Sequence, residues 1–289
     1  MESDLRQLTK DEYPPALREI PQVPDHLWIR GELPSPDHKL LTVVGSRDLS
    51  PYGREVIDYL IGGLSGYPVA IVSGLALGAD AASHRAALAA GLPTLAFPGS
   101  GIADSAIAPR TNAGLAQKIL GSGGALLSEY APTSTPQPWM FPQRNRLMVG
   151  IAQAVLVIEA GERSGTLITA RLAGEYNREL LCVPHRIGDP HGYGSSLFLR
   201  LGAGLVTEPS HLLEALQIPE KEEVSFRDEG SQQLSPNEEL LLSLLTAPTS
   251  RGDLVTRSKL PQGDALTALV MLELRGLVYE EFGCWQRCS

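Results

Sequence analysis

The chain has 289 residues, of which 43% are hydrophobic and 20% charged, and its formal net charge is −9 at pH 7. This length fits a large domain with a small second one, and the acidic balance excludes a protein that coats nucleic acid indiscriminately, because such binders carry a basic domain. No apolar run is long enough to span a bilayer, and residues 1–10 lack the apolar core of a signal peptide. We therefore expect a cytoplasmic protein that contacts no membrane.

Apolar segments of strand type and helix type alternate along residues 39–217. We expect strands at 40–44, 69–72, 94–97, 125–127, 154–158, 180–183 and 204–206. We expect helices at 53–64, 79–90, 111–120, 166–176 and 209–216. The strand segments are continuously apolar, which indicates burial on both faces of a mostly parallel sheet with helices on each side. The predicted fold class is α/β, with a Rossmann-like doubly wound sheet in residues 39–217.

The flanking segments differ in composition from this central domain. Residues 1–38 are expected to pack on the core as an N-terminal extension. Residues 218–235 are polar and have no apolar period, which is typical of a solvated linker. Residues 236–289 contain three helical patterns and a hairpin around Phe282 and Gly283, which predicts a small winged-helix domain. Because this domain is slightly acidic, contact with DNA and contact with protein both stay open for it.

Small residues follow several predicted strands, where a helix is about to begin. At such a corner the backbone N–H groups and the positive helix end face an anion, and an arginine adds a bidentate contact to phosphate oxygens. The corners consist of Gly45, Ser46 and Arg47, of Ser73 and Gly74, of Gly99 and Ser100, and of Ser164, Gly165 and Thr166. We expect Ser46 to cap the helix that follows it.

Neither a cofactor nor a metal ion is expected. The first strand is not followed by G-x-G-x-x-G, the fingerprint of nicotinamide and flavin binding. The three cysteines lack C-x-x-C spacing, and His185 and His191 lack a third ligand at a suitable spacing.

Charged side chains near the strand ends leave more than one interpretation open. Asp80 and His84 lie one turn apart in a predicted helix, where they either contact a ligand or only fix the loop. Without a nucleophile beside them they do not form a catalytic triad.

Arg144 and Arg146 flank Asn145 near the start of another predicted helix. Residues two apart on a helix point in different directions, so we expect one arginine to reach the pocket and the other to form structural pairs. Glu129 and Glu159 are the candidate partners, and Glu159 ends a buried strand.

Six segments occur in one order: YPPAL at 13–17, VVGSR at 43–47, SGLALGAD at 73–80 with His84 after it, SEY at 128–130, FPQRNRLMVGIAQAVLVIEA at 141–160, and SGTLITARLA at 164–173. Together they span about 160 residues and resemble the DprA/Smf family, the DNA-processing proteins A. The resemblance raises the expectation that at least one arginine of the RNR segment contacts a ligand.

The resemblance implies a protein that binds single-stranded DNA without breaking a bond. It further implies protection of incoming strands during natural transformation, loading of RecA recombinase against single-strand-binding protein, and a homodimer formed through the α/β domain. Aromatic residues make up 6% of the chain and none interrupts the motifs, so we expect backbone contacts rather than extensive base stacking. The competing interpretations are a hydrolase of the N-glycosidic bond, with Glu159 and Asp80 as acid and base, and an adaptor that senses a nucleotide.

Overall fold

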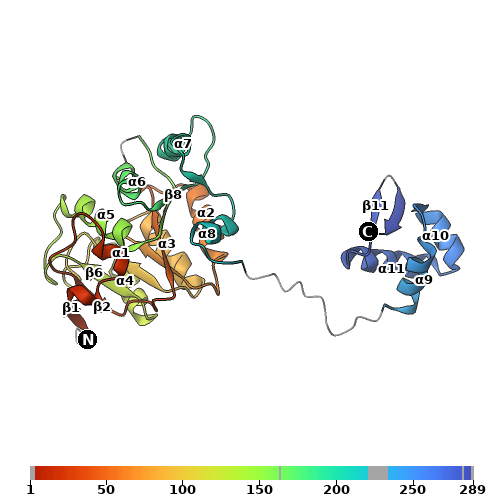
Figure 1. Cartoon of the computed structure of the whole chain (residues 1–289), viewed down its shortest axis with the longest axis horizontal. Coiled ribbons are helices and arrows are strands. Elements are labelled where there is room, and N and C mark those ends of the chain that lie inside the picture. Colours follow the sequence, from red (N-terminus) through yellow and green to blue (C-terminus); the bar gives the residue numbers. More distant parts are fainter. Residues whose placement is uncertain (1–3, 163, 221–233, 282, 288–289) are drawn as a thin grey trace. The chain divides into compact units, whose positions relative to one another are not determined.

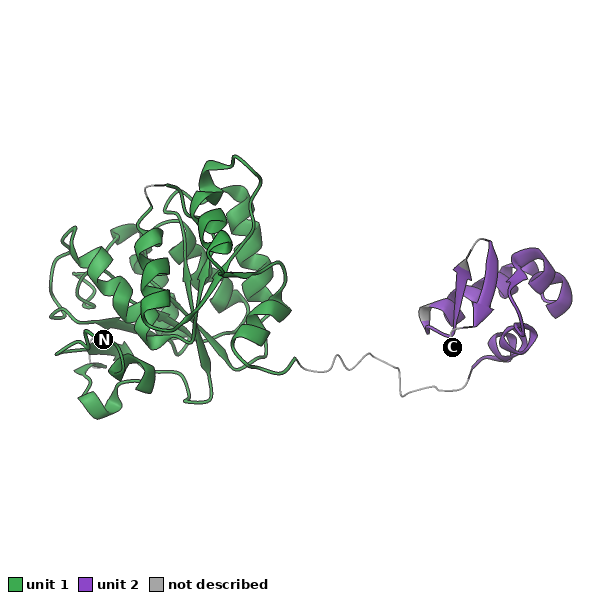
Figure 2. Ribbon diagram, turned by 45° about the horizontal axis from the view of Figure 1, so that its top comes forward, with its two compact units in different colours: residues 1–220 green, residues 221–289 purple. Residues whose placement is uncertain are grey.

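The computed structural model describes residues 4–162, 164–220, 234–281 and 283–287. They form two compact units, within residues 1–220 and within residues 221–289 (Figure 2). Residues 221–233 of the predicted linker and Phe282 of the predicted hairpin lie outside the described residues. None of the helices in these described ranges combines the length and the apolar character needed to cross a lipid bilayer.

A nine-stranded sheet forms the centre of the first unit, in the order β1-β2-β6-β5-β4-β3-β7-β8-β9. Neighbouring strands from β6 to β9 in this order pair in parallel. The strands are β1 (Leu5–Gln7), β2 (Trp28–Gly31), β3 (Lys39–Val44), β4 (Val69–Ser73), β5 (Thr94–Ala96), β6 (Ala125–Ser128), β7 (Ala154–Val157), β8 (Glu179–Cys182) and β9 (Gly204–Leu205). The seven strands predicted from apolar runs are all present, and the predicted α/β fold class is confirmed.

Helices cover both faces of this sheet (Figure 1). They are α1 (Pro15–Arg18), α2 (Pro51–Gly62), α3 (Ala79–Ala89), α4 (Ala113–Gly121), α5 (Met140–Ile151), α6 (Thr166–Glu175), α7 (Tyr193–Arg200) and α8 (Pro209–Ala215), with short 3-10 helices at Lys10–Glu12, Arg110–Asn112 and Pro190–Gly192. Successive side chains of a strand point to opposite faces. Leu41 and Val43 of β3 therefore pack with α2, α3 and α8, whereas Leu40 and Val44 pack with α1, α5, α6 and α7.

Helix boundaries deviate from the predictions where a cap or a short turn intervenes. α2 begins at Pro51, two residues early, because Ser50 accepts a hydrogen bond from the N–H of Gly53 and caps the helix. α4 begins later than predicted, because a 3-10 turn at Arg110–Asn112 precedes it. α7 was not predicted at all, since glycine and serine fill its first turn.

The N-terminal residues contribute two strands that were not predicted, in addition to packing on the core. β1 pairs antiparallel with β2, and β2 pairs antiparallel with β6. Tyr13, Leu17 and Leu27 are buried in the same core cluster as β5 and β7. β1 was not predicted because it has three residues and exposes Arg6 and Gln7, so it contains no apolar run.

The direction of strand order reverses between β3 and β7, which are neighbours in the sheet. The chain leaves β3 towards α2 on one face and leaves β7 towards α6 on the other. The two loops therefore diverge, and a crevice opens between them at the carboxyl ends of the strands, which is where doubly wound sheets bind ligands.

The second unit has its own small core, formed by Leu241, Leu254, Leu269 and Trp285 among others. Its helices are α9 (Pro236–Leu244), α10 (Arg251–Ser258) and α11 (Gln262–Leu274). Its strands β10 (Thr249–Ser250), β11 (Val278–Glu281) and β12 (Cys284–Arg287) form an antiparallel sheet in the order β10-β12-β11. The three helices and the hairpin strands follow the predicted order, and its assignment as a winged helix stays a prediction.

Candidate functional site

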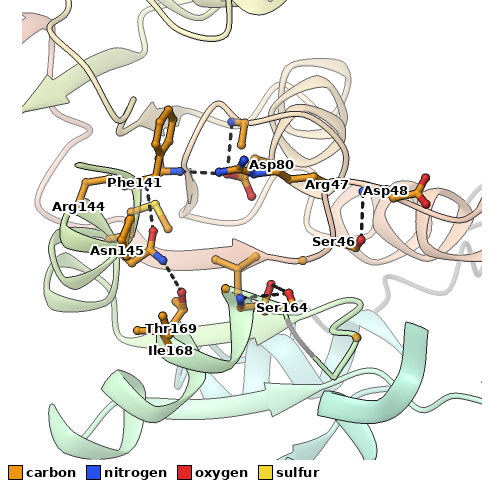
Figure 3. A pocket seen from close by; sticks show the side chains of 18 residues that line it. Ser46, Arg47, Asp48, Asp80, Phe141, Arg144, Asn145, Ser164, Ile168 and Thr169 are labelled. Atoms are coloured by element: carbon orange, nitrogen blue, oxygen red, sulfur yellow. Dashed lines mark hydrogen bonds and ion pairs between the residues drawn. The ribbon is translucent and has the colours of Figure 1, made fainter. Parts of the chain in front are cut away.

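An open cavity of about 700 Å³ lies at the carboxyl ends of β3 and β7. The loop after β3, the segment around the start of α3, one side of α5 and the start of α6 line this first cavity (Figure 3). Of the predicted site residues, it brings together Gly45, Ser46, Arg47, Asp80, Arg144, Asn145, Ser164, Gly165 and Thr166.

The loop after β3 lies directly against the start of α3. The carbonyl oxygen of Ser46 accepts a hydrogen bond from the N–H of Ala79, at 3.0 Å. Gly78 has a φ of 71°, and a Cβ there would lie 2.2 Å from the same carbonyl oxygen, so no other residue fits without strain. The Ser46 hydroxyl accepts from the N–H of Asp48 at 3.1 Å. The expectation that Ser46 caps the next helix is wrong, because the loop is longer and Ser50 takes that role.

Arg47 presents a guanidinium group at the mouth of the cavity. The residue is exposed, and its Cζ lies 5.2 Å from the ring centroid of Phe141, in cation–π geometry. Its guanidinium forms no salt bridge with any carboxylate of the described residues. It is therefore held in place by an aromatic ring and keeps its N–H donors for an anionic ligand.

Arg144 lines the cavity from α5, but its guanidinium group is committed to the protein. It donates to the backbone oxygens of Gly74 and Phe97, and its Nη2 lies 3.5 Å from Oδ2 of Asp80. A Cβ on Gly74 would lie 2.1 Å from the guanidinium, so this contact requires glycine. Burial lowers the pKa of Arg144 to about 10, which leaves the group charged at neutral pH. Arg144 thereby joins the ends of β4 and β5 to α5.

Asp80 and His84 are both buried on α3 and have different partners. Oδ2 of Asp80 accepts from the N–H of Ala76 at 3.3 Å, and burial raises the pKa of Asp80 while Arg144 opposes this rise. Nδ1 of His84 lies 2.7 Å from the Thr94 hydroxyl, which itself donates to a backbone oxygen, so Nδ1 is the donor. Burial lowers the pKa of His84 to about 3. Asp80 lines the cavity and His84 does not, and both hold the surrounding loop and strand together.

The first residues of α6 form the opposite wall. The Ser164 hydroxyl accepts from the N–H of Thr166 at 3.2 Å and donates to the Thr166 hydroxyl at 2.9 Å. Asn145 accepts from Nε of Arg144 at 3.0 Å and donates to the Thr169 hydroxyl at 3.0 Å, which connects α5 with α6 (Figure 3). The positive end of the α6 dipole faces the cavity, which favours an anion there.

Five predicted contact residues do not line the first cavity: Ser73, Gly74, Gly99, Ser100 and Arg146. The hydroxyls of Ser73 and Ser100 donate to the backbone oxygens of Val43 and Gly101, so both serve the fold. Gly74 and Gly99 make room for the side chains of Arg144 and Phe141. These positions shape the cavity from behind.

Arg146 points to the other side of α5, as expected for residues two apart on a helix. It forms an ion pair with Glu129 and donates to the backbone oxygen of Gln22 at 2.7 Å. Arg144 is thus the member of the pair that lies at the first cavity, and Arg146 forms the structural pair with Glu129.

Glu159 is fully buried behind the start of α2 and does not line the cavity. Its carboxylate accepts from the N–H of Ser50 at 3.1 Å and from the Ser50 hydroxyl, and it lies 3.4 Å from Nδ1 of His191. Asp80 is paired with Arg144. The acid–base pair that an N-glycosidic hydrolase would need is therefore not assembled at the cavity.

Phe141 lines the first cavity and was missed by the sequence analysis. The expectation that the motifs contain no aromatic residue is wrong, because Phe141 is the first residue of the segment 141–160. Phe141 and Arg144 are three apart on α5 and share one side of the helix, so their spacing was a usable signal. Ile168 and Thr169 of α6 also line the cavity and carried no such signal.

Comparison with known proteins identifies relatives that match most of the chain. The family described as DNA recombination-mediator protein A matches residues 5–217. Protein Smf of Escherichia coli (strain K12) is 38% identical over 272 residues, which cover 92% of this chain and 72% of Smf. The DNA processing protein DprA of Streptococcus pneumoniae is 39% identical over 203 residues, which cover 70% of this chain and 71% of DprA.

Two solved structures share the architecture. DprA from Streptococcus pneumoniae superimposes with a TM-score of 0.68 at 36% identity, over 74% of this chain and 75% of that chain. DNA processing protein A from Helicobacter pylori, whose structure reports a single-stranded DNA binding mode, superimposes with a TM-score of 0.65 at 26% identity, over 75% of this chain and 98% of that chain.

Replacing Arg144 by alanine is expected to lower the free energy of unfolding by about 3 kcal/mol, because it leaves buried Asp80 and two backbone oxygens without their partner. Urea denaturation of the first unit measures this change. Arg85→Ala, an exposed arginine on α3, is the matched control and is expected to stay within about 0.5 kcal/mol of the wild type. Equal losses in the two variants would contradict the structural role of Arg144.

Buried His84 is expected to make stability depend on pH. Its pKa in the folded chain is about 3, so between pH 6.5 and 3 the unfolded chain binds the proton and the folded chain does not. Its contribution is complete above about pH 6.5 and is lost as the pH falls, by at most about 1.4 kcal/mol per pH unit. Urea denaturation between pH 7 and pH 4.5 is expected to give a shallower slope for His84→Gln than for the wild type. Identical slopes would show that His84 takes up its proton in the folded state.

Proposed function

The chain belongs to the DNA recombination-mediator protein A family, and on this basis we propose that the first cavity binds the sugar–phosphate backbone of single-stranded DNA. The observation that carries the proposal is the convergence of the Arg47 guanidinium and the positive end of α6 on one open cavity at the switch point of the sheet. The structurally similar DNA processing protein A from Helicobacter pylori has a reported single-stranded DNA binding mode, which supports this choice of ligand.

The chemistry of the cavity suits a phosphodiester. Gly165 lines the cavity and a Cβ there would meet nothing within 4 Å, so the backbone of a strand can approach the protein backbone closely at this wall. Ser46, Ser164 and Thr166 add hydroxyl groups, and Arg47 adds a fork of donors matched to phosphate oxygens. Contacts of this kind fix the strand without reading its sequence. We therefore expect weak sequence preference and strong dependence on salt.

The proposal extends to partners through the family. A recombination mediator acts on a strand that a recombinase then takes over, so RecA recombinase and single-strand-binding protein are the partners we propose. A homodimer would join two such cavities and raise avidity, since the second cavity of the pair then binds at a high effective concentration. We place the protein in the cytoplasm during natural transformation and recombination, where such strands meet RecA.

Replacing Arg47 by alanine is expected to weaken binding of a fluorescein-labelled thymidine 20-mer about tenfold at low salt, because one charge-assisted contact is lost. The slope of log K against log salt concentration is expected to fall by about 0.7, the value for one phosphate of a single strand. Fluorescence anisotropy at four salt concentrations measures both quantities.

Arg85→Ala serves as the control, because it removes the same charge from an exposed site that does not line the cavity. Its affinity is expected to stay within about twofold of the wild type, and its salt slope within about 0.2 of the wild-type slope. An Arg47→Ala variant that behaves like Arg85→Ala would remove the first cavity from the binding surface.

A further inference from the structure

A second cavity of about 280 Å³ adjoins the first and is shaped by α5, α6 and the segment around Gln22. Pro142 of α5 and Ile168 of α6 line both cavities, so the two form one continuous surface. The second cavity has the volume of about nine water molecules in the liquid, which is enough space for a single nucleobase.

The charge of the second cavity does not suit a phosphate. Among the described residues that line it, Arg146 is the sole cation, and its guanidinium is engaged by Glu129 and by the backbone oxygen of Gln22. Glu175 places an exposed carboxylate on its wall, which would repel a phosphate. Pro142, Ile168 and Leu172 add apolar surface. A flat, uncharged ring is therefore the part of a nucleotide that this cavity accepts.

An exposed tryptophan lies on the same face of α5. Trp139 is the residue just before the first turn of α5 and has helical backbone angles. Pro142, Gln143 and Arg146 of the second cavity follow it by three, four and seven residues, so they lie on the same side of the helix as Trp139. The residue is 55% exposed, which is unusual for so large an apolar group.

The ring of Trp139 is held in a fixed orientation. Tyr130 packs against it edge-on, with ring centroids 5.7 Å apart and an interplanar angle of 86°. Burial beside Glu129 raises the pKa of Tyr130 to about 12, so its phenol stays neutral and does not disturb this contact. One side of the indole thus contacts protein, while more than half of Trp139 stays exposed to a ligand.

We propose that the second cavity and Trp139 bind nucleobases of the strand whose phosphate occupies the first cavity, an inference that rests on the proposed function. The strand passes from the first cavity over Pro142 and Ile168, places one base in the second cavity and stacks a neighbouring base on Trp139. The face of α5 thereby adds base contacts that depend little on sequence, because every base offers a flat ring. The single strand is selected over duplex DNA, whose bases are not available for stacking.

The test compares two variants with two oligonucleotides at several salt concentrations. Trp139→Ala is expected to weaken binding of a thymidine 20-mer about tenfold, and Ile168→Ala about threefold, both without a change in salt slope, since neither side chain carries a charge that neutralises a phosphate. An abasic 20-mer, which keeps every phosphate and lacks the bases, is expected to bind both variants as well as it binds the wild type.

Matched controls have similar exposure elsewhere on the first unit. Tyr59→Ala removes an aromatic residue that is 57% exposed on α2, and Ile187→Ala removes a fully exposed isoleucine. Neither residue lines the first or the second cavity. Both are expected to bind like the wild type. The thymidine 20-mer is expected to quench the tryptophan fluorescence of the wild type. Trp139→Phe is expected to keep affinity within about twofold and to lose this quenching.

Three outcomes would overturn the inference. The first is an affinity of Trp139→Ala equal to that of Tyr59→Ala, and the second is binding of the abasic strand weakened as much as binding of the thymidine strand. The third is a lower mass of Trp139→Ala measured by sedimentation, which would show that a second copy of the chain covers Trp139. In each case Arg47→Ala still lowers the affinity and the salt slope. Rejection of the base-binding inference is therefore distinguished from rejection of the proposed function. Loss of all oligonucleotide binding by the wild type would reject both.

Discussion

The buried guanidinium group of Arg144 is the interaction on which the candidate site depends. It binds the backbone oxygens that follow β4 and β5 and lies beside Asp80 at the start of α3, so one side chain from α5 holds three segments. A buried charge is tolerated when each donor has a partner, and this requirement fixes the loops around it. Gly74 follows from the same constraint, since any side chain there would occupy the position of the guanidinium.

Fixing these segments with one arginine leaves another free to act on a ligand. Arg47 lies in the loop that contacts α3, and its guanidinium packs on the Phe141 ring. Its N–H donors remain available to a ligand in the cavity. The chain carries a net charge of −9, so attraction for a phosphate is local and comes from this guanidinium and the end of α6. Under the proposed function, the excess of acidic residues in the chain would disfavour binding of a strand away from this cavity.

Much of the architecture could be read from the sequence. The seven apolar strands and most helices follow from patterns that local burial produces, and the resemblance to the DprA/Smf family anticipated the family match over residues 5–217. β1 and β2 could not be read, because these short segments carry no apolar run and form structure by pairing with each other and with β6. α7 could not be read because glycine and serine fill its first turn, and the helix forms where it packs on β8. Of the corners, those after β3 and β7 meet at the cavity, and those after β4 and β5 support it from behind.

The sequence by itself determined which residue types stand at the strand ends, and hence that small residues and arginines would gather at one edge of a parallel sheet. Only the tertiary structure decided their roles: Arg144 serves the fold, Arg146 pairs with Glu129, Glu159 accepts hydrogen bonds from Ser50 at the start of α2, and Phe141 enters the site. The reason is physical. Side-chain identity and spacing are local properties, whereas burial, the direction of a side chain and the nearest opposite charge depend on segments that lie far apart in the chain and meet only when it folds.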